Sequence, residues 1–212
     1  MVVVLLIVAN VLVFFWELSL GPTELDAAIH ALGFVPRRFF GWEQAGGATL
    51  DPIRFLPLLT ANFLHGGWAH IIGNMWFLWI FGDNVEDAMG RFRFLLFYLL
   101  CGLAAALAQV LVTPFSRQPM VGASGAIAGV LGAYLLLYPR ARVRCLWIFV
   151  VFVTFVNIPA WALLGFWFVS QFFVPLESGV AWMAHVGGFV AGLILVRLFV
   201  SPPLHARSAW TR

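Results

Sequence analysis

The sequence predicts an all-α integral membrane protein, a bundle of six transmembrane helices with a long interfacial first outer loop, and three observations predict it. Hydrophobic residues make up 63% of the 212 residues, charged residues make up 10%, and the mean hydropathy is +0.98. A soluble domain carries about 25% charged residues, so this chain needs lipid as its solvent. Apolar segments that approach the thickness of a bilayer recur along the chain. Neither a repeat nor a low-complexity tract interrupts them, so residues 1–212 are predicted to form one domain.

The first and fifth apolar segments need separate arguments. The chain begins with an apolar run that lacks a basic stretch and a small-residue cleavage site, which indicates a retained helix rather than a signal peptide. The fifth run, Cys145–Val174, exceeds the roughly 20 residues that one crossing requires. Proline suits the first turn of a helix and disrupts its interior, so Pro159 is predicted to begin the crossing and Leu146–Asn157 to lie along or dip into the membrane. The six predicted spans are Met1–Trp16, Asn62–Phe81, Phe92–Val112, Val121–Tyr138, Pro159–Val174 and Val180–Val200.

All 12 basic residues are arginines, and their positions predict the orientation. With the N-terminus inside, eight arginines fall on inner segments and four on outer segments, which favours a cytoplasmic N-terminus and a cytoplasmic C-terminus. The inner arginines are Arg91, Arg93, Arg140, Arg142, Arg144, Arg197, Arg207 and Arg212, and the outer ones are Arg37, Arg38, Arg54 and Arg117. None belongs to a basic run interleaved with the groups that contact bases, so no nucleic-acid binding is predicted.

One long connection, Ser19–Thr60, joins the first two predicted spans. It mixes glycine, proline and charged residues with short hydrophobic pieces. Long connections in compact proteins usually have a structure or a function of their own. We expect a partly helical loop at the membrane interface, with Phe39, Phe40 and Trp42 at the level of the headgroups.

Polar residues within apolar spans are costly, so each one is a candidate functional residue. Ser124 lies in Gly122-Ala-Ser124-Gly125 at the outer end of the fourth predicted span. This is not the G-x-S-x-G elbow of soluble hydrolases, because residue 126 is alanine and no strand is predicted before it. The first turn of a helix offers unpaired N–H groups and a positive dipole end, which would stabilise an oxyanion beside a serine nucleophile. On this motif alone, a small packing residue is the better interpretation of Ser124.

His185 lies near the outer end of the sixth predicted span. Taken alone, an intramembrane histidine is more often structural than a proton relay or a catalytic base. Glycine pairs on the fourth and sixth spans change this balance, because small-residue faces let two helix backbones approach closely. Packing these faces together would bring Ser124 and His185 to the same depth, where a hydroxyl beside an imidazole forms the minimal activated nucleophile. The pairs are Gly125 with Gly129 and Gly188 with Gly192.

A third polar cluster lies at the outer end of the second predicted span. His70 and Asn74 are four residues apart, so they project from one helix face, and both side chains can donate to an oxyanion. His65 lies at the edge of the loop and is interpreted as structural. The sequence has no H-E-x-x-H motif and no intramembrane carboxylate that completes a ligand set, so no metal and no other cofactor is predicted.

Taken together, these residues resemble the rhomboid family of intramembrane proteases. The resemblance rests on Phe63-Leu64-His65-Gly66-Gly67-Trp68-Ala69-His70, Asn74, Gly82, Glu86, the Gly122–Gly125 turn, Ala184-His185, Gly188 and Gly192. It implies a six-helix rhomboid-like bundle that acts as a serine endopeptidase on the transmembrane segments of other proteins. The implied partners are these substrates and the lipid bilayer, and we expect the bacterial inner membrane as the location.

The resemblance also implies a role for each site residue. Ser124 would be the nucleophile and His185 the general base of a catalytic dyad. His70, Asn74 and the Ser124 backbone N–H would bind the oxyanion, in a site that includes Gly122. The substrate would be a single-span protein with a helix-destabilising segment and small residues near the cut.

Further features follow from the same resemblance. Glu86 would be a structural polar residue on the cytoplasmic side, and the fifth span with the loop Gln171–Ala181 would form a movable gate and cap. Ala128 stands where some members place a tyrosine against the histidine, and Arg54 is the arginine nearest to the family's Trp-Arg pair. No acidic residue neighbours His185 in the sequence, and Glu177 falls in the cap loop, so packing and other hydrogen bonds would hold the imidazole.

Two other functional classes share some of these features. A catalytically inactive rhomboid-like scaffold would bind transmembrane helices without cutting them, but such proteins lack the serine or the histidine. A small membrane transporter would show broken helices and charged residues near the midplane, whereas the polar clusters here lie near one face. Both classes remain alternatives, and the sequence predicts no oligomeric state.

Overall fold

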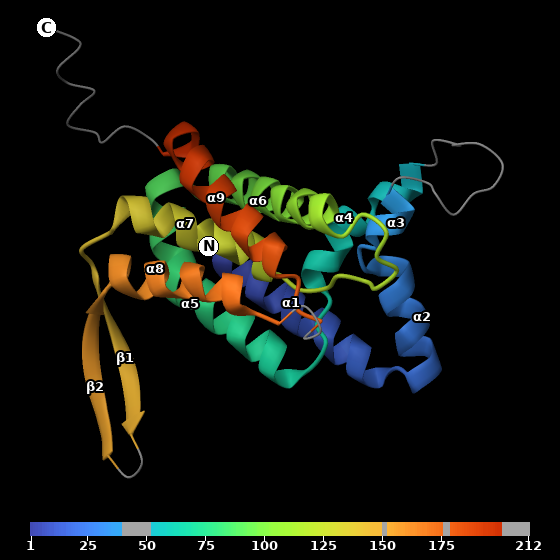
Figure 1. Cartoon of the computed structure of the whole chain (residues 1–212), viewed down its shortest axis with the longest axis horizontal. Coiled ribbons are helices and arrows are strands. Elements are labelled where there is room, and N and C mark those ends of the chain that lie inside the picture. Colours follow the sequence, from blue (N-terminus) through green and yellow to red (C-terminus); the bar gives the residue numbers. More distant parts are fainter. Residues whose placement is uncertain (40–51, 150–151, 176–178, 201–212) are drawn as a thin grey trace, which may run out of the picture.

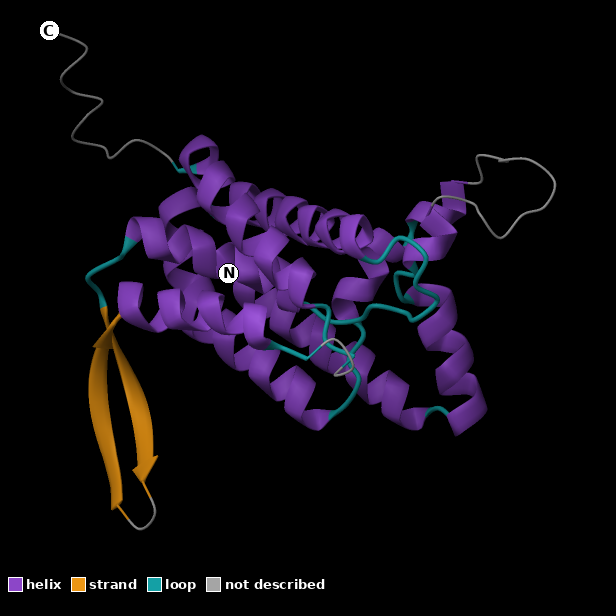
Figure 2. Ribbon diagram, in the orientation of Figure 1, coloured by secondary structure: helices purple, strands orange, loops and turns teal. Residues whose placement is uncertain are grey.

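The computed structural model describes residues 1–39, 52–149, 152–175 and 179–200, and these residues are mostly helical (Figure 1; Figure 2). Phe40, Trp42, Glu177, Arg207 and Arg212, which the sequence analysis assigned to loops or to one side of the membrane, lie outside the described residues. The α-helices are α1 (Val2–Ser19), α2 (Pro22–Leu32), α3 (Pro36–Phe39), α4 (Pro57–Thr60), α5 (Trp68–Met89), α6 (Arg91–Val112), α7 (Ser124–Leu137), α8 (Ala160–Ser170) and α9 (Trp182–Phe199). The other elements are the 3-10 helices η1 (Pro52–Phe55), η2 (Ala61–Phe63) and η3 (Gln171–Phe173) and the strands β1 (Arg142–Phe149) and β2 (Phe152–Pro159).

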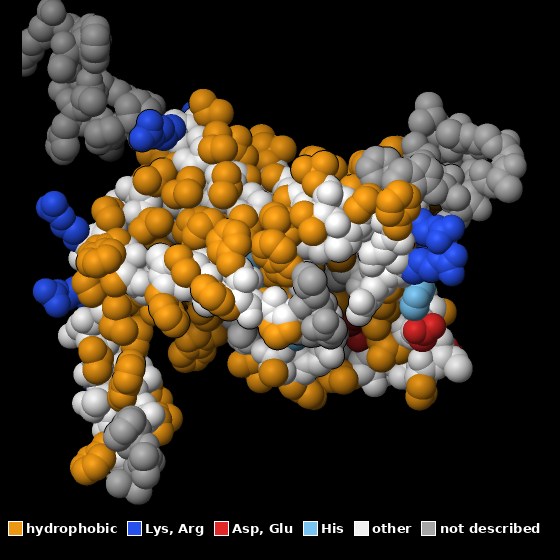
Figure 3. Space-filling model, in the orientation of Figure 1, with side chains coloured by type: hydrophobic (Ala, Val, Ile, Leu, Met, Phe, Trp, Pro, Cys, Tyr) orange, Lys and Arg blue, Asp and Glu red, His pale blue; other side chains and the backbone are white. Residues whose placement is uncertain are grey.

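Three of these helices, α1, α6 and α9, are long and apolar enough to cross a membrane. The helix α7 and the run from α8 through η3 are apolar but shorter, and α5 carries Asp83, Glu86 and Asp87 in its C-terminal part. Large apolar side chains cover much of the outer surface of the bundle, as Figure 3 shows. Lipid rather than water solvates such a surface, and the chain is an integral membrane protein, as its composition predicts.

The helix α7 lies in the core of the bundle, with ten consecutive buried residues from Gly125 to Tyr134. Its glycines lie against α9. A Cβ atom on Gly188 would lie 2.0 Å from the carbonyl oxygen of Gly125, and one on Gly192 would lie 2.0 Å from that of Gly129. No side chain fits at these distances, so the two glycine faces pack together as the sequence predicts, and they fix the depth of Ser124 relative to α9.

A buried carboxylate joins α5 to the start of α1. Glu86 is 4% exposed and accepts hydrogen bonds from the backbone N–H groups of Val2 and Val3, at 2.8 Å each. The amino group of Met1 lies 3.9 Å from the same carboxylate. A negative charge at a helix N-terminus binds the unpaired N–H groups and favours the dipole. These contacts support the structural role predicted for Glu86.

The segment between α7 and α8 departs from the predicted all-α fold. Leu146–Asn157, which the sequence predicts to lie along or in the membrane, belongs to an antiparallel hairpin whose register runs from Arg142 opposite Pro159 to Phe149 opposite Phe152. Both strands are rich in β-branched and aromatic residues, which pack well on a pleated surface, and the periodicity of a short apolar run does not separate strand from helix. The all-α prediction is wrong for this segment. The prediction for the following helix agrees with the structure, because Pro159 is the N-cap of α8.

The connection between α1 and α5 is partly helical over its described residues, as predicted, and contains α2, α3, η1, α4 and η2. Phe34 and Met120 form a β-bridge in which each N–H donates to the other's carbonyl, at 3.0 and 2.8 Å. The Thr60 hydroxyl donates to the Leu32 carbonyl at 2.7 Å. The bridge fastens the connection to the segment that precedes α7, so it helps to position the wall of the site described next.

Candidate active site

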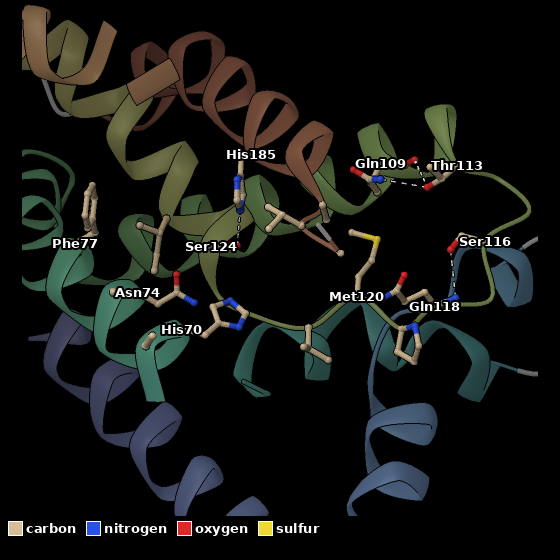
Figure 4. A pocket seen from close by; sticks show the side chains of 18 of the residues that line it. His70, Asn74, Phe77, Gln109, Thr113, Ser116, Gln118, Met120, Ser124 and His185 are labelled. Carbon is tan, nitrogen blue, oxygen red and sulfur yellow. Dashed lines mark hydrogen bonds between the residues drawn. The ribbon is translucent and has the colours of Figure 1, made fainter. Parts of the chain in front are cut away.

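Ser124 and His185 meet between α7 and α9. Ser124 is the first residue of α7, and His185 lies in the first turn of α9. The His185 Nε2 atom lies 2.8 Å from the Ser124 Oγ atom, as the dashed line in Figure 4 marks. Both side chains are half-buried. The structure therefore brings together the two residues that the glycine faces predict to be neighbours.

The other ring nitrogen of His185 contacts a glutamine that the sequence analysis did not single out. The Gln171 Oε1 atom lies 2.8 Å from His185 Nδ1, and the Gln171 Nε2 atom donates to the Trp167 carbonyl at 2.9 Å and to the Ser170 hydroxyl at 3.2 Å. Because the amide nitrogen faces two acceptors, the amide oxygen must be the atom that faces the imidazole. This assignment places the proton of neutral His185 on Nδ1 and leaves Nε2 free to accept the proton of Ser124.

Apolar packing completes the support of the imidazole. The Trp167 ring lies 6.0 Å from the His185 ring, with the planes tilted by 39°. Residue 128, where a tyrosine could also pack against the imidazole, is a fully buried alanine. The helix α8 and η3 therefore provide a ring and a hydrogen-bond acceptor for His185.

One rule could have identified Gln171 from the sequence. It is a polar residue at the end of a predicted span, and polar residues in spans are candidate functional residues. Neighbouring carboxylates in the sequence are a different signal, and Gln171 does not belong to it. Among the described residues the acceptor for Nδ1 is a neutral amide.

His70 and Asn74 approach the site from α5, on the other side of Ser124 (Figure 4). The backbone N–H of Gly66 donates to His70 Nδ1 at 3.3 Å, so the ring proton of neutral His70 lies on Nε2. A Cβ atom on Gly122 would lie 2.6 Å from His70 Nε2 and 3.6 Å from Asn74 Nδ2. Both donors therefore converge on the backbone just before Ser124. The predicted set of His70, Asn74 and Ser124 lies together in the structure.

Gly122 is required by its backbone and by its surroundings. Its φ angle is +120°, which residues with a side chain rarely adopt, and any Cβ would collide with His70. Its N–H donates to the Ala61 carbonyl at 2.8 Å, so this N–H is already occupied. Gly122 contributes space for His70 rather than a hydrogen-bond donor.

His65 supports Asn74 from behind. The Asn74 Nδ2 atom lies 3.0 Å from His65 Nε2, and His65 Nδ1 lies 3.2 Å from the Phe63 carbonyl, which makes Nδ1 the protonated nitrogen and Nε2 the acceptor. His65 lies in the loop between η2 and α5, outside the helical spans, and burial, assisted by the nearby His70, lowers the pKa of its imidazole to about 4. The ring is neutral near pH 7 and can accept from Asn74. The predicted structural role of His65 thus includes orienting a site residue.

A cavity of about 490 Å³ opens beside these groups. Ser124, His185, His70 and Asn74 all line it, and Gln118 and Met120 form part of its wall. Among the described residues, no group of three or more histidine, cysteine or acidic side chains could hold a metal ion. The cavity thus contains a hydroxyl paired with an imidazole and two side-chain donors, which are the groups that acyl transfer needs.

Comparison with known proteins reveals relatives. The family model described as the Rhomboid domain matches residues 53–202 of this chain. The protein named Rhomboid protease GluP, from Bacillus subtilis, is 35% identical over 138 residues, which are 64% of this chain and 24% of that protein. RHOMBOID-like protein 6, mitochondrial, from Arabidopsis thaliana is 31% identical over 157 residues, which are 72% of this chain and 45% of that protein. Presenilin-associated rhomboid-like protein A, mitochondrial, from Danio rerio is 35% identical over 91 residues, 42% of this chain and 24% of that protein. The chain spans less than half the length of each of these relatives.

Proposed function

Because this chain belongs to the rhomboid family, we propose that it is an intramembrane serine endopeptidase that cleaves transmembrane segments of other membrane proteins. The observation that carries this proposal is the 2.8 Å contact between Ser124 Oγ and His185 Nε2, with the imidazole oriented from behind by Gln171. An inactive rhomboid-like scaffold has no need for this contact, and a transporter would use polar groups near the midplane.

Acylation begins with Ser124. Its Oγ attacks the carbonyl carbon of the scissile peptide bond while His185 Nε2 takes the hydroxyl proton. The resulting imidazolium then gives this proton to the leaving amine as the C–N bond breaks, and the acyl group stays on Ser124. In deacylation, His185 takes a proton from water as the hydroxide attacks the ester carbon. The C–Oγ bond then breaks, the carboxylic acid product leaves, and the proton returns to Ser124 Oγ. The dyad is unchanged after one turnover.

The oxyanion would lie between three donors. His70 Nε2–H and Asn74 Nδ2–H converge on the backbone before Ser124, and the N–H of Ser124 belongs to the first turn of α7, where no intrahelical acceptor exists. The positive end of the α7 helix dipole would further stabilise the negative charge of the oxyanion. Removing one such donor typically costs a factor of about 10²–10³ in kcat.

Gln171 would act as a positioning residue. As a neutral acceptor it holds the imidazole in the tautomer that leaves Nε2 unprotonated, and it stabilises the imidazolium through the same contact. In soluble serine proteases an aspartate has this role. A neutral amide avoids placing an extra charge in the membrane, where an ionised carboxylate is costly.

The gate would be formed by α8, η3 and the following loop. Only Ala160 and Leu164 are buried among the eleven residues of α8, against ten of fourteen in α7. An element with few buried contacts opens at low cost in free energy. Displacing α8 would expose the cavity to a helix arriving from the lipid. We propose six spans, α1 and α5 through α9, with the site near the outer face and both termini cytoplasmic. Arg91 at the start of α6, Arg140 just after α7 and Arg197 in the last turn of α9 all lie at the end of the bundle away from Ser124, as the cytoplasmic side requires.

A serine-directed phosphonate tests this proposal. We expect the protein in detergent to form a covalent adduct, located on Ser124 by mass spectrometry, and to cleave a single-span substrate. Ser124→Ala should abolish both the adduct and the cleavage while the protein stays folded. Ser116→Ala is the matched control, because Ser116 lines the same cavity without contacting His185, and it should behave as the wild type. Cleavage by Ser124→Ala at the wild-type rate would overturn the proposal.

A further inference from the structure

The hairpin of β1 and β2 takes no part in the proposed site. It extends away from the helices at the end of the bundle opposite Ser124, at a steep angle to α8 (Figure 1). Its base is fixed by backbone hydrogen bonds from Ala160 N–H to the Ala141 carbonyl at 2.8 Å and from Trp161 N–H to the Pro139 carbonyl at 3.0 Å. The hairpin is thus attached firmly to the first residues of α8.

The register of the hairpin divides polar from apolar side chains along its length. Side chains alternate between two faces, and paired residues share a face. Near the base, one face carries Arg142 and Arg144, the latter opposite Asn157. Farther out, both faces are almost entirely apolar. The apolar side chains of this distal half that are more than half exposed are Leu146 (54%), Trp147 (53%), Ile148 (65%), Phe152 (73%), Val153 (64%) and Phe155 (57%).

Such a hairpin needs a covering partner. A two-stranded sheet without one is marginally stable in water, and a continuous apolar patch of this kind marks an interaction site. The hydrocarbon centre of the bilayer does not suit it, because the unpaired N–H and C=O groups on its strand edges would find no partners there. The boundary between headgroups and hydrocarbon meets both needs, since it covers apolar side chains and leaves water within reach of the edges.

The charge around the base indicates which lipids cover it. Arg140, Arg142 and Arg144 are exposed, and none of them forms an ion pair with another described residue. Figure 3 shows basic side chains projecting at this end of the molecule, next to the apolar surface of the hairpin. Arg91, Arg93 and Arg197 also belong to this end. The carboxylates there are Asp83, Asp87 and Glu86, and Glu86 already binds the start of α1.

The aromatic contact of Arg144 agrees with this location. Its guanidinium lies 4.3 Å from the centre of the Phe155 ring, so a charged group is held directly beside the apolar distal half. Arginine in this arrangement can bind a phosphate while its stem remains in contact with apolar groups.

We propose that the hairpin is an interfacial membrane anchor: its distal half lies at the hydrocarbon boundary of the leaflet opposite the site, and its basal arginines bind the headgroups of anionic phospholipids. A basic residue near an anionic surface contributes about fivefold to binding. Because β2 runs directly into α8, the anchor also fixes the depth of the first residues of α8 in the bilayer.

The binding preference can be measured on the full chain in detergent by native mass spectrometry, with phosphatidylglycerol and phosphatidylcholine as competing lipids. We expect phosphatidylglycerol to bind more tightly and Arg142→Gln to reduce this preference about fivefold. Arg117→Gln is the charge-matched control, because Arg117 is an exposed arginine in the segment before α7, at the other end of the bundle. An equal effect of both substitutions, or no preference in the wild type, would overturn the proposal.

The depth of the hairpin is a second, independent measurement. A spin label can be attached at Thr154→Cys, an exposed position that pairs with Trp147 across the hairpin. The Cys145→Ser substitution removes the competing thiol, and Cys101 is fully buried. In nanodiscs that contain phosphatidylglycerol, relaxation by oxygen should exceed relaxation by a water-soluble nickel chelate. Full access of the chelate would contradict insertion, and spin–spin broadening would show that the hairpin pairs with a second copy instead. Neither measurement depends on proteolysis, so both remain valid if the proposed activity fails.

Discussion

The contact between Gln171 and His185 yields the most informative prediction. The acceptor is 6% exposed and lies 2.8 Å from Nδ1, so Gln171→Ala would leave a buried ring N–H without its partner. An unsatisfied buried donor costs about 1–3 kcal/mol. Since the imidazolium of the transition state donates more strongly than neutral histidine, this cost falls mainly on kcat, and a roughly 5-fold to 150-fold decrease is expected.

The pH dependence of the rate separates positioning from packing. Gln171→Ala removes an acceptor that stabilises the imidazolium, so the acid limb of the pH–rate profile should move to lower pH while the maximum rate falls. Gln171→Glu offers a carboxylate instead, which stabilises the imidazolium and should move the acid limb to higher pH. If Gln171 had only a structural role, both substitutions would change the amount of folded protein, but they would not move the acid limb of the profile in opposite directions.

The assay is steady-state cleavage of a fluorogenic transmembrane peptide in detergent micelles, with thermal unfolding measured on the same samples. Gln118→Ala is the matched control, because Gln118 lines the same cavity and its backbone N–H donates to the Ser116 hydroxyl, away from Ser124 and His185. It should retain the wild-type kcat and profile. An unchanged kcat in Gln171→Ala, or the same acid limb in both Gln171 variants, would refute the assignment of Gln171 as a positioning residue.

Three further outcomes are expected from the same assay. Asn74→Ala should lower kcat by about 10²–10³ with little change in KM, because the donor is used only in the transition state; an effect confined to KM would contradict this role. Gly192→Ala should lower the thermal midpoint and the activity together, because its Cβ would lie 2.0 Å from the Gly129 carbonyl oxygen. Such overpacking costs about 1–3 kcal/mol of stability. A stable and fully active variant would show that α7 and α9 are not held at this distance. Wild-type cleavage should increase with pH as His185 loses its proton, and a flat profile would count against His185 as the base.

The central pairing could be predicted from the sequence because it depends on a regular spacing. Glycines four residues apart on two spans determine how closely α7 and α9 approach, and this approach fixes the relative depth of Ser124 and His185. His70 and Asn74 were predictable for the same reason, as two residues on one helix face. A site built from helix faces at one depth leaves a periodic pattern in the sequence.

Gln171 and the hairpin left no comparable pattern. Gln171 reaches His185 because the chain turns from α8 into η3 and returns to α9, a path through a loop whose geometry no sequence spacing determines. In the hairpin, an apolar run of strand length has the same composition as part of a helix, and the pairing of Arg144 with Asn157 appears only once the two strands are aligned. Both features depend on contacts between segments rather than on a local period.

The support of the base comes largely from the element proposed as the gate. The indole of Trp167 and the amide of Gln171 belong to α8 and η3, whereas α7 contributes the Ser124 hydroxyl and has Ala128 where some members have a tyrosine. If α8 moves aside to admit a substrate helix, the ring contact and the Nδ1 acceptor leave His185 together. The imidazole is then competent only after α8 returns over the bound substrate. On the proposed mechanism an open gate and an oriented His185 would exclude each other, so water entering the open cavity would meet Ser124 without its general base.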